Sequence, residues 1–400
     1  MRLGLYISVP FCRTKCSYCN FASDVFSKAA YENYVARVLQ DIDDAQKTAS
    51  KLGCILPETV DSVYLGGGTP SLLDTAQLAR IFTAVRERFP VSSDAEVTVE
   101  CAPGTLTPVL TETLLACGVN RVSLGVQSFV DQEAQSVGRL HKRVMVLEEI
   151  ARLRGAGLSN LNIDLIAGLP HQTPESWTFS VSETVATGAP HVSVYMLEVD
   201  EDSRLGRELI AGGTRYHAHF VPDEEATADF YLQACDTLNA AGITQYEISN
   251  FARAGCESRH NLKYWTRQPY LGFGVDAHSM LPASSRSSVR AIRFSTPASL
   301  DAYMNRRLQT VTQVSAQGAL EESLFLGLRL NHGVDLERMR ADFSPEAMAA
   351  CQSAIEECVR EGLLERRDAT IYLTARGRLL SNEVFVKFLT EQGVAGTRSA

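Results

Sequence analysis

The sequence lacks a long hydrophobic run, an excess of basic residues and the features of a signal peptide. No stretch of about 18 or more apolar residues occurs in the 400-residue chain, so we expect no membrane span. The formal net charge of -9 at pH 7 argues against nucleic acid as a partner, because nucleic-acid binders normally have a basic surface. Met1 leads directly into "LGLYISVP", and we therefore expect a cytoplasmic protein.

The ten cysteines also lack the even spacing of a disulfide framework, and most are isolated. Three of them, Cys12, Cys16 and Cys19, lie together in "YISVPFCRTKCSYCNF". A structural zinc site normally takes four ligands in two close pairs, and no second pair of that spacing follows. A redox C-x-x-C pair would leave Cys12 without a role. We favour an iron–sulfur cluster held by three thiolates, which leaves one iron open to a further ligand.

The first 200 residues read as a repeated unit of strand and helix. Short β-branched runs alternate with helical patterns at roughly 30-residue spacing, which predicts parallel strands joined by crossover helices. The runs cover residues 3–9, 60–68, 95–101, 120–126, 161–169 and 191–197. Six units favour an α/β fold with a partial (β/α)6 barrel over a closed barrel of eight units. A flat doubly wound sheet is the alternative that periodicity alone leaves open.

The rest of the chain predicts a second, smaller domain. We expect the barrel and a ligand-binding tract in residues 1–281, a linker in 282–315 and a C-terminal domain in 316–400. Two short runs around "RRDA", followed by a helix, predict an α+β, winged-helix-like cap. Its acidic balance favours a cap that packs on the barrel over a DNA-binding unit.

Polar residues stand at the ends of successive predicted strands. The turn "GGGTP" follows the second strand, and Glu100, Gln127 and Asp164 follow the next three. The glycines let the backbone approach a ligand closely, and the strand ends are where a barrel builds its site. We therefore expect these residues to surround a bound molecule.

The C-x3-C-x2-C spacing after the first strand resembles the signature of the radical S-adenosylmethionine (SAM) family. The tract around it resembles the oxygen-independent coproporphyrinogen oxidase branch. The resemblance implies a [4Fe-4S] cluster on Cys12, Cys16 and Cys19, with SAM at the open iron and an adenosyl radical formed by an electron from the cluster. It also implies a set of SAM contacts, some of which match a second SAM molecule in that branch: Tyr6, Tyr18, Gly67, Gly68, Thr69, Glu100, Gln127, Arg139 and Asp164.

Two departures from that branch point to the HemW-type heme chaperones. Phe21 stands where the coproporphyrinogen dehydrogenase has a further cysteine, and the long extension before the first strand is missing. The tract "SRHNLKYW" resembles the H-N-x-x-Y-W signature of the HemW type, proposed to bind heme. An imidazole can ligate heme iron, and two aromatic rings offer apolar surface. The resemblance therefore implies heme, as cargo, at His260, Tyr264 and Trp265, with Cys256 as an alternative ligand and the role of His278 open.

The functional hypothesis is a heme chaperone that delivers heme to acceptor haemoproteins, respiratory ones among them. We expect it to form a homodimer. The alternative is a coproporphyrinogen III dehydrogenase, which removes two propionate carboxyl groups by radical chemistry. A radical enzyme acting on RNA is disfavoured by the acidic charge. No catalytic residue is assigned, and the sequence leaves open whether SAM is cleaved.

Overall fold

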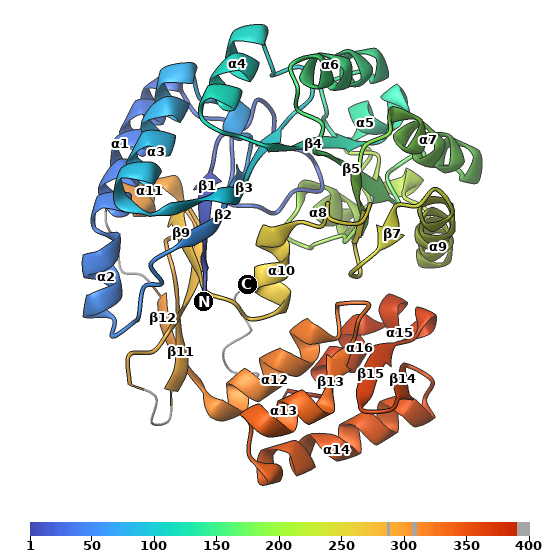
Figure 1. Ribbon diagram of the computed structural model, residues 1–400. Helices are drawn as coiled ribbons and strands as arrows, with labels where there is room; N and C mark the ends of the chain where they lie inside the picture. The colour runs from blue at the N-terminus through green and yellow to red at the C-terminus, as the bar shows by residue number, and fades with distance from the viewer. Residues whose placement is uncertain (286–288, 306–309, 390–400) are drawn as a thin grey trace.

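A curved sheet of 12 strands forms the centre of the molecule (Figure 1). The structure is a computed structural model that describes residues 1–285, 289–305 and 310–389. The first six strands lie side by side in chain order and pair in parallel. They are β1 (Leu3–Val9), β2 (Val60–Gly67), β3 (Val91–Cys101), β4 (Arg121–Gln127), β5 (Leu161–Ala167) and β6 (His191–Met196). The predicted α/β fold with a partial barrel is confirmed.

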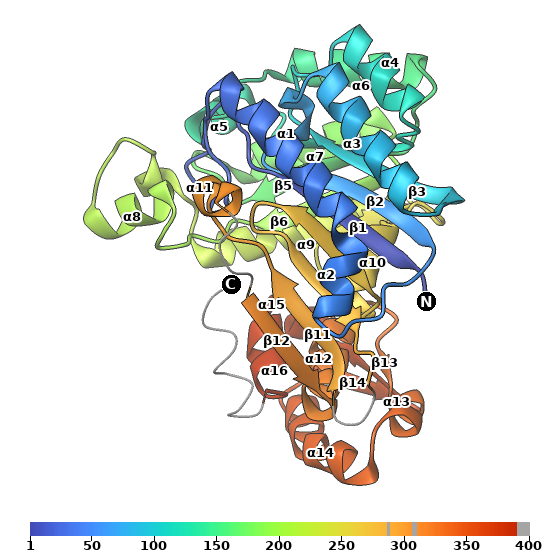
Figure 2. The same cartoon turned by 90° about the vertical axis from the view of Figure 1, so that its left-hand side faces the viewer.

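Helices cover the outside of this sheet (Figures 1 and 2). The strands are buried on both faces, and six of the seven residues of β1 are buried, which explains their nearly continuous apolar runs. Capping residues set where helices begin: Asp74 and Gln77 form a capping box. The helices of the barrel are α1 (Lys28–Asp43), α2 (Ala45–Lys51), α3 (Thr75–Arg88), α4 (Pro108–Ala116), α5 (Asp131–Ser136), α6 (Arg143–Gly155), α7 (Pro174–Thr187), α8 (Arg204–Ala211) and α9 (Glu224–Ala240).

The sheet continues beyond the six parallel strands at both edges. β9 (Tyr270–Gly274) pairs in parallel with β1, and three antiparallel strands follow it: β10 (His278–Pro282), β11 (Val289–Ser295) and β12 (Thr310–Ser315). β8 (Asn250–Ala252) and β7 (Thr244–Gln245) extend the edge beside β6.

Residues 282–315, predicted as a linker, therefore contain two strands of the main sheet in their described part. The short helix α11 (Leu300–Met304) lies between these strands and packs near α1. Cross-strand pairing of β11 with both neighbours satisfies its backbone groups, which a free linker would leave to water.

A small domain follows the sheet and has its own apolar core. Its three-stranded antiparallel sheet has the order β13 (Val334–Asp335), β15 (Thr370–Leu373) and β14 (Leu364–Arg367). The surrounding helices are α12 (Ala316–Gly327), α13 (Leu336–Asp342), α14 (Pro345–Arg360), α15 (Ala375–Leu379) and α16 (Ser381–Val386). This domain lies against the side of the barrel where α10 (Arg259–Trp265) is found (Figure 1).

Within the described ranges, every helix is either too short or too polar to cross a membrane.

Candidate functional site

The three clustered cysteines lie in the loop between β1 and α1. Backbone hydrogen bonds hold the two ends of this loop together. The Cys12 N–H donates to the carbonyl of Asp24 at 3.0 Å, and the Asp24 N–H donates to the carbonyl of Pro10 at 2.9 Å. The Lys15 ammonium donates to two further loop carbonyls, those of Phe21 and Ser23. The loop therefore holds its cysteines in a fixed backbone frame.

The thiols of the loop fit an iron–sulfur cluster. Burial is the main cause that raises the pKa of Cys12 and of Cys19, so both are thiols until a metal displaces the proton. The Thr69 hydroxyl lies 4.0 Å from the sulfur of Cys12, and Arg139 Nη1 lies 3.7 Å from that of Cys16. Such donors stabilise anionic sulfur ligands.

In the described part of the chain, no three His, Cys, Asp or Glu side chains converge on a single metal ion. In an iron–sulfur cluster each thiolate binds a different iron, so the sulfurs need not meet at one point.

The glycine turn after β2 packs against the end of β1. Gly68 donates its N–H to the carbonyl of Val9, and Thr69 donates to that of Phe11, each at 2.7 Å. A Cβ atom on Gly68 would lie 2.7 Å from the Phe11 oxygen, and Gly67 has a φ of +99°. Only glycines allow this close approach, which places the turn directly beside the cysteine loop.

Glu100 lies at the end of β3 and faces the same turn. Tyr64 donates its hydroxyl to Oε1 at 2.8 Å, and the Gly67 N–H donates to Oε2 at 3.2 Å. Burial raises the pKa of Glu100 to about 7, opposed by the bond from Tyr64. A buried carboxylate beside backbone donors is a suitable partner for the ammonium group of SAM, so the residues present fit this cofactor. The contribution of Tyr64 is missing from the sequence prediction, although Tyr64 stands two residues before the glycine turn.

The predicted residues of the next strands gather nearby. Arg139 donates to the carbonyl of Gly125. Burial disfavours its positive charge, but the nearby Tyr18 and Cys16 favour that charge, and the net effect raises the pKa of Arg139. Gln127 takes a left-handed φ of 67°, which is unusual for this residue type, and its buried Oε1 finds no hydrogen-bond partner among the described residues. This buried oxygen of Gln127 could therefore accept a hydrogen bond from a bound ligand.

Asp164 on β5 is held by neighbouring polar side chains. Ser123 donates to one carboxylate oxygen at 3.1 Å, and Asn162 donates to the other at 2.7 Å. Burial is the main cause that raises its pKa. Asp164 and Glu100 both line a small polar cavity of about 50 Å³ inside the barrel.

A larger cavity of about 650 Å³ is lined by three of the residues predicted to contact SAM, Tyr6, Gly67 and Gly68, and by a second group of side chains. One part is formed by the glycine turn and β1, another by Tyr264 and the strands β9 to β12, and a third by the end of the cysteine loop. Its lining residues are Tyr6, Ser8, Asn20, Phe21, Ala22, Gly67, Gly68, Tyr264, Tyr270, Asp276, His278, Ser295, Thr296, Pro297, Ala298 and Thr310. The cavity has room for more than a small cofactor alone, and Phe21, 65% exposed, stands at it.

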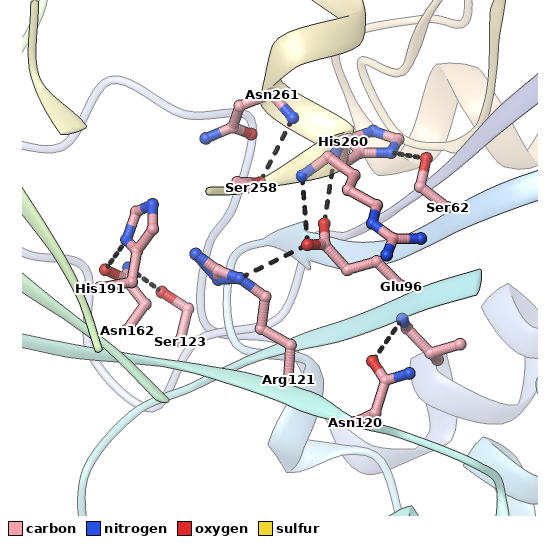
Figure 3. A network of polar contacts seen from close by, with 12 residues as sticks. Ser62, Glu96, Asn120, Arg121, Ser123, Asn162, His191, Ser258, His260 and Asn261 are labelled. Carbon is pink, nitrogen blue, oxygen red and sulfur yellow. Dashed lines mark hydrogen bonds and ion pairs between the residues drawn. The ribbon is translucent and has the colours of Figure 1, made fainter. Parts of the chain in front are cut away.

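The helix α10 carries the H-N-x-x-Y-W tract and is fixed by buried polar contacts (Figure 3). Glu96 accepts hydrogen bonds from the backbone N–H groups of Arg259 and His260, and it lies 3.8 Å from Arg121. An acceptor carboxylate at the first turn satisfies N–H groups that have no partner within the helix. Ser258 caps the same end by accepting from Asn261.

The three residues predicted to bind heme face different surroundings. His260 is buried, and its ring nitrogens pair with the hydroxyls of Ser62 at 3.0 Å and Tyr264 at 2.9 Å. Burial lowers the pKa of His260 to about 3, helped by Lys263. Tyr264 lines the large cavity.

Trp265 faces the C-terminal domain instead. The guanidinium carbon of Arg329 lies 4.3 Å from the centre of its ring. Its buried indole N–H finds no partner among the described residues. The structure therefore brings Tyr264 to the cavity that Tyr6, Gly67 and Gly68 also line, whereas Trp265 contacts the chain after α12.

Comparisons with known proteins show which family the chain belongs to. The model of the radical SAM superfamily matches residues 6–180, and that of the HemN C-terminal domain matches residues 314–380. A heme chaperone HemW of Bacillus subtilis is 34% identical over 387 residues, which are 96% of this chain and 99% of that protein. The chain belongs to the radical SAM superfamily.

Within the superfamily it is of the HemW type. A heme chaperone HemW of Escherichia coli is 30% identical over 97% of this chain and 98% of that protein. The fold also matches the structure of the radical SAM enzyme coproporphyrinogen III oxidase (HemN) from Escherichia coli, with a TM-score of 0.80. That match covers 97% of this chain and 90% of the other at 22% identity, so it shows the shared fold alone.

Proposed function

We propose that this chain is a heme chaperone, which binds a [4Fe-4S] cluster, SAM and heme and delivers heme to acceptor haemoproteins. The observation that carries the proposal is the cavity of about 650 Å³, in which the glycine turn, Phe21 and Tyr264 share one space. A flat tetrapyrrole needs an aromatic, largely preformed site of this size class. The full-length similarity to several heme chaperones supports the same assignment.

In this proposal Cys12, Cys16 and Cys19 hold the cluster, and the SAM contacts are the nine residues predicted for them. A bound cluster supplies one-electron chemistry, and SAM at its open iron supplies a source of an adenosyl radical. The glycine turn and Glu100 orient the amino-acid end of SAM through backbone and carboxylate contacts. His260, Tyr264 and Trp265 form the tract proposed to serve heme.

The second candidate is a coproporphyrinogen III dehydrogenase, favoured by the fold shared with the oxidase from Escherichia coli. Phe21 argues against it, because a phenyl ring neither binds metal nor passes a hydrogen atom. Phe21 is 65% exposed at the large cavity, where a reactive cysteine of that enzyme would be expected by position.

An anaerobic assay separates the two candidates. The chain, reconstituted with its cluster, is mixed with SAM, a reductant and coproporphyrinogen III, and mass spectrometry follows the loss of carboxyl groups from the tetrapyrrole. The chaperone proposal predicts no decarboxylated product, together with stoichiometric binding of added heme. Multiple turnovers to a product lacking two carboxyl groups would overturn it.

We further propose a cytoplasmic location, respiratory haemoproteins among the acceptors, and a homodimer formed through the cysteine loop. Phe21 and Val25, 65% and 56% exposed, put apolar surface on this loop. Light scattering of the chain with and without its cluster tests the dimer. A cluster-loaded chain that stays monomeric would contradict it.

A further inference from the structure

The helix α10 places a histidine and a tyrosine one turn apart, but only the tyrosine reaches the large cavity. Residues four apart on a helix lie on one face, so the rings of His260 and Tyr264 meet, with centroids 5.2 Å apart. His260 is 1% exposed and does not line the cavity, whereas Tyr264 does. The imidazole is therefore the inner member of the pair and the phenol is the outer one.

Both nitrogens of the inner ring are already in use. Nδ1 pairs with the Ser62 hydroxyl and Nε2 with the Tyr264 hydroxyl. The ring is held from the other sides as well, because the rings of Tyr6 and Tyr64 lie 6.1 Å and 5.3 Å from it. To ligate an iron in the cavity, His260 would have to leave two hydrogen bonds and cross the phenol that covers it. Breaking these hydrogen bonds would leave the buried hydroxyl of Ser62 without its histidine partner, which costs free energy.

Several other side chains around the cavity are possible iron ligands by their chemistry. In the described ranges these are Tyr6, Tyr264, Tyr270, Asp276 and His278. Tyr264 differs from the others because its hydroxyl lies 2.9 Å from a buried imidazole nitrogen, and an N–H on that nitrogen can donate to a phenolate oxygen. Asp276 and His278 instead lie 3.8 Å from each other at the exposed side of the cavity.

We propose that the phenolate oxygen of Tyr264 is the protein ligand to the iron of a ferric heme in this cavity, and that His260 is a positioning residue behind it. The inference rests on the proposed function and differs from the sequence prediction, in which the His260 imidazole binds the iron. Tyrosine is an established axial ligand of heme, as in catalase.

The proton balance of this step is simple. The O–H bond of Tyr264 breaks, an O–Fe(III) bond forms, and one proton leaves for solvent. A phenol holds its proton at neutral pH, so the proton is released only when iron binds. The iron stays ferric throughout, and no oxidant or reductant is consumed.

The Ser62 hydroxyl lets Tyr264 lose its proton while the hydrogen bonds from Ser62 to His260 and from His260 to Tyr264 are both kept. In the proposed free state, Nε2 accepts from the phenol and Nδ1–H donates to Ser62. When the phenolate forms, the phenol proton passes to Nε2, and the proton of Nδ1 is the one released, by way of the Ser62 hydroxyl. Nε2–H then donates to the phenolate oxygen, and the Ser62 hydroxyl donates to Nδ1. A hydroxyl serves in either direction, so both bonds at 3.0 Å and 2.9 Å survive the change of imidazole tautomer.

The test is a titration of the full chain with hemin, followed by absorption and resonance Raman spectroscopy. The account predicts a phenolate-to-iron(III) charge-transfer band, enhanced phenolate modes in the Raman spectrum and one proton released per heme bound. In Tyr264→Phe these features are lost. Tyr246→Phe is the matched control, because its hydroxyl also pairs with a histidine Nε2 at 2.9 Å, that of His191, but lies outside the cavity.

Tyr246 also accepts from the backbone of Ser258 at the start of α10, so a general disturbance of this helix would show in the control. His260→Ala should keep the phenolate modes, bind hemin about tenfold more weakly and shift the charge-transfer band. His260→Gln, which retains a polar group toward Tyr264, should restore part of the affinity.

The outcomes separate this inference from the proposed function. A chain that binds no hemin contradicts both. Stoichiometric hemin binding without phenolate modes, or with a spectrum changed in His260→Ala or His278→Ala and unchanged in Tyr264→Phe, overturns the inference and leaves the chaperone proposal in place.

Discussion

Glu100 is the residue whose ionisation couples the candidate site to the stability of the fold. Its pKa in the folded chain is about 7, above the ordinary value of 4.5, chiefly because it is buried. The folded chain therefore keeps a proton that the unfolded chain releases above pH 4.5. The stability that this provides is complete below pH 4.5 and is lost as the pH rises through 7.

We therefore predict that Glu100→Gln removes a pH-dependent part of the free energy of unfolding. The difference between wild type and variant should change by up to about 3 kcal/mol between pH 4.5 and 8, measured by denaturant unfolding without SAM. A difference that stays flat over this range would show that Glu100 titrates normally.

The cysteines give a second prediction for single residues. Cys19→Ser should abolish the iron–sulfur absorption and the bound iron after anaerobic reconstitution, because two thiolates do not hold the cluster. Cys256→Ser is the control, since Cys256 is similarly half-buried but lies far along the chain, before α10. Equal cluster content in both variants would contradict the assignment.

How far single residues could be predicted depends on whether their partners lie close in sequence. The spacing of Cys12, Cys16 and Cys19 carries its meaning within eight residues. By contrast, His260 is paired with Ser62, 198 positions earlier, and no local pattern reveals that pair. The same holds for Tyr64, whose hydrogen bond to Glu100 joins two neighbouring strands, β2 and β3.

Among the elements, α10 depends most on contacts that the sequence hides. Lys263 is almost fully buried and pairs with Asp61 at 2.6 Å, and Gly4 leaves room for its side chain. A Cβ atom on Gly4 would lie 2.7 Å from Lys263 Cδ. This pair ties the helix to β1 and β2 and so holds Tyr264 in place.

Breaking this pair should loosen α10. We predict that Lys263→Met lowers the free energy of unfolding by about 3 kcal/mol, because it leaves a partly buried carboxylate unpaired. The double variant Lys263→Met/Asp61→Asn should recover part of the loss, which denaturant unfolding of both variants would measure. Equal stability of wild type and Lys263→Met would show that the ion pair contributes nothing.

The six parallel strands could be predicted because each is a buried, apolar run with turn signals at its ends. β10 to β12 could not, although each pairs with its neighbour in sequence, because the stretch around β11 is rich in Ser and Arg and reads as a linker. Antiparallel pairing with β9 makes this polar stretch a sheet edge that borders the large cavity. Tertiary pairing thus overrides local composition here.

At the scale of the whole molecule, the cavity is built by segments from across the barrel sequence. The cysteine loop, the glycine turn, α10 and the edge strands β9 to β12 all contribute lining residues. Trp265 and Arg329 link the back of α10 to the C-terminal domain, so this domain supports the helix that carries Tyr264.

The contact between Arg329 and Trp265 predicts that a substitution of Arg329 changes the tryptophan fluorescence. Arg329→Gln should alter the emission of Trp265, which loses the guanidinium over its ring, and should speed proteolysis after α12. The other tryptophan, Trp177, is fully buried in the barrel and serves as the internal reference. Unchanged emission and proteolysis would contradict a contact of this kind.

The most direct test of the chaperone account is the transfer of heme to an acceptor. The cluster-loaded chain, charged with one heme, is mixed with the apo form of a respiratory b-type haemoprotein, and the Soret band of the acceptor is followed with time. The account predicts stoichiometric transfer that is faster than from heme bound to serum albumin and slower in Tyr264→Phe. Heme that stays on the chain, or transfer no faster than from albumin, would contradict the account.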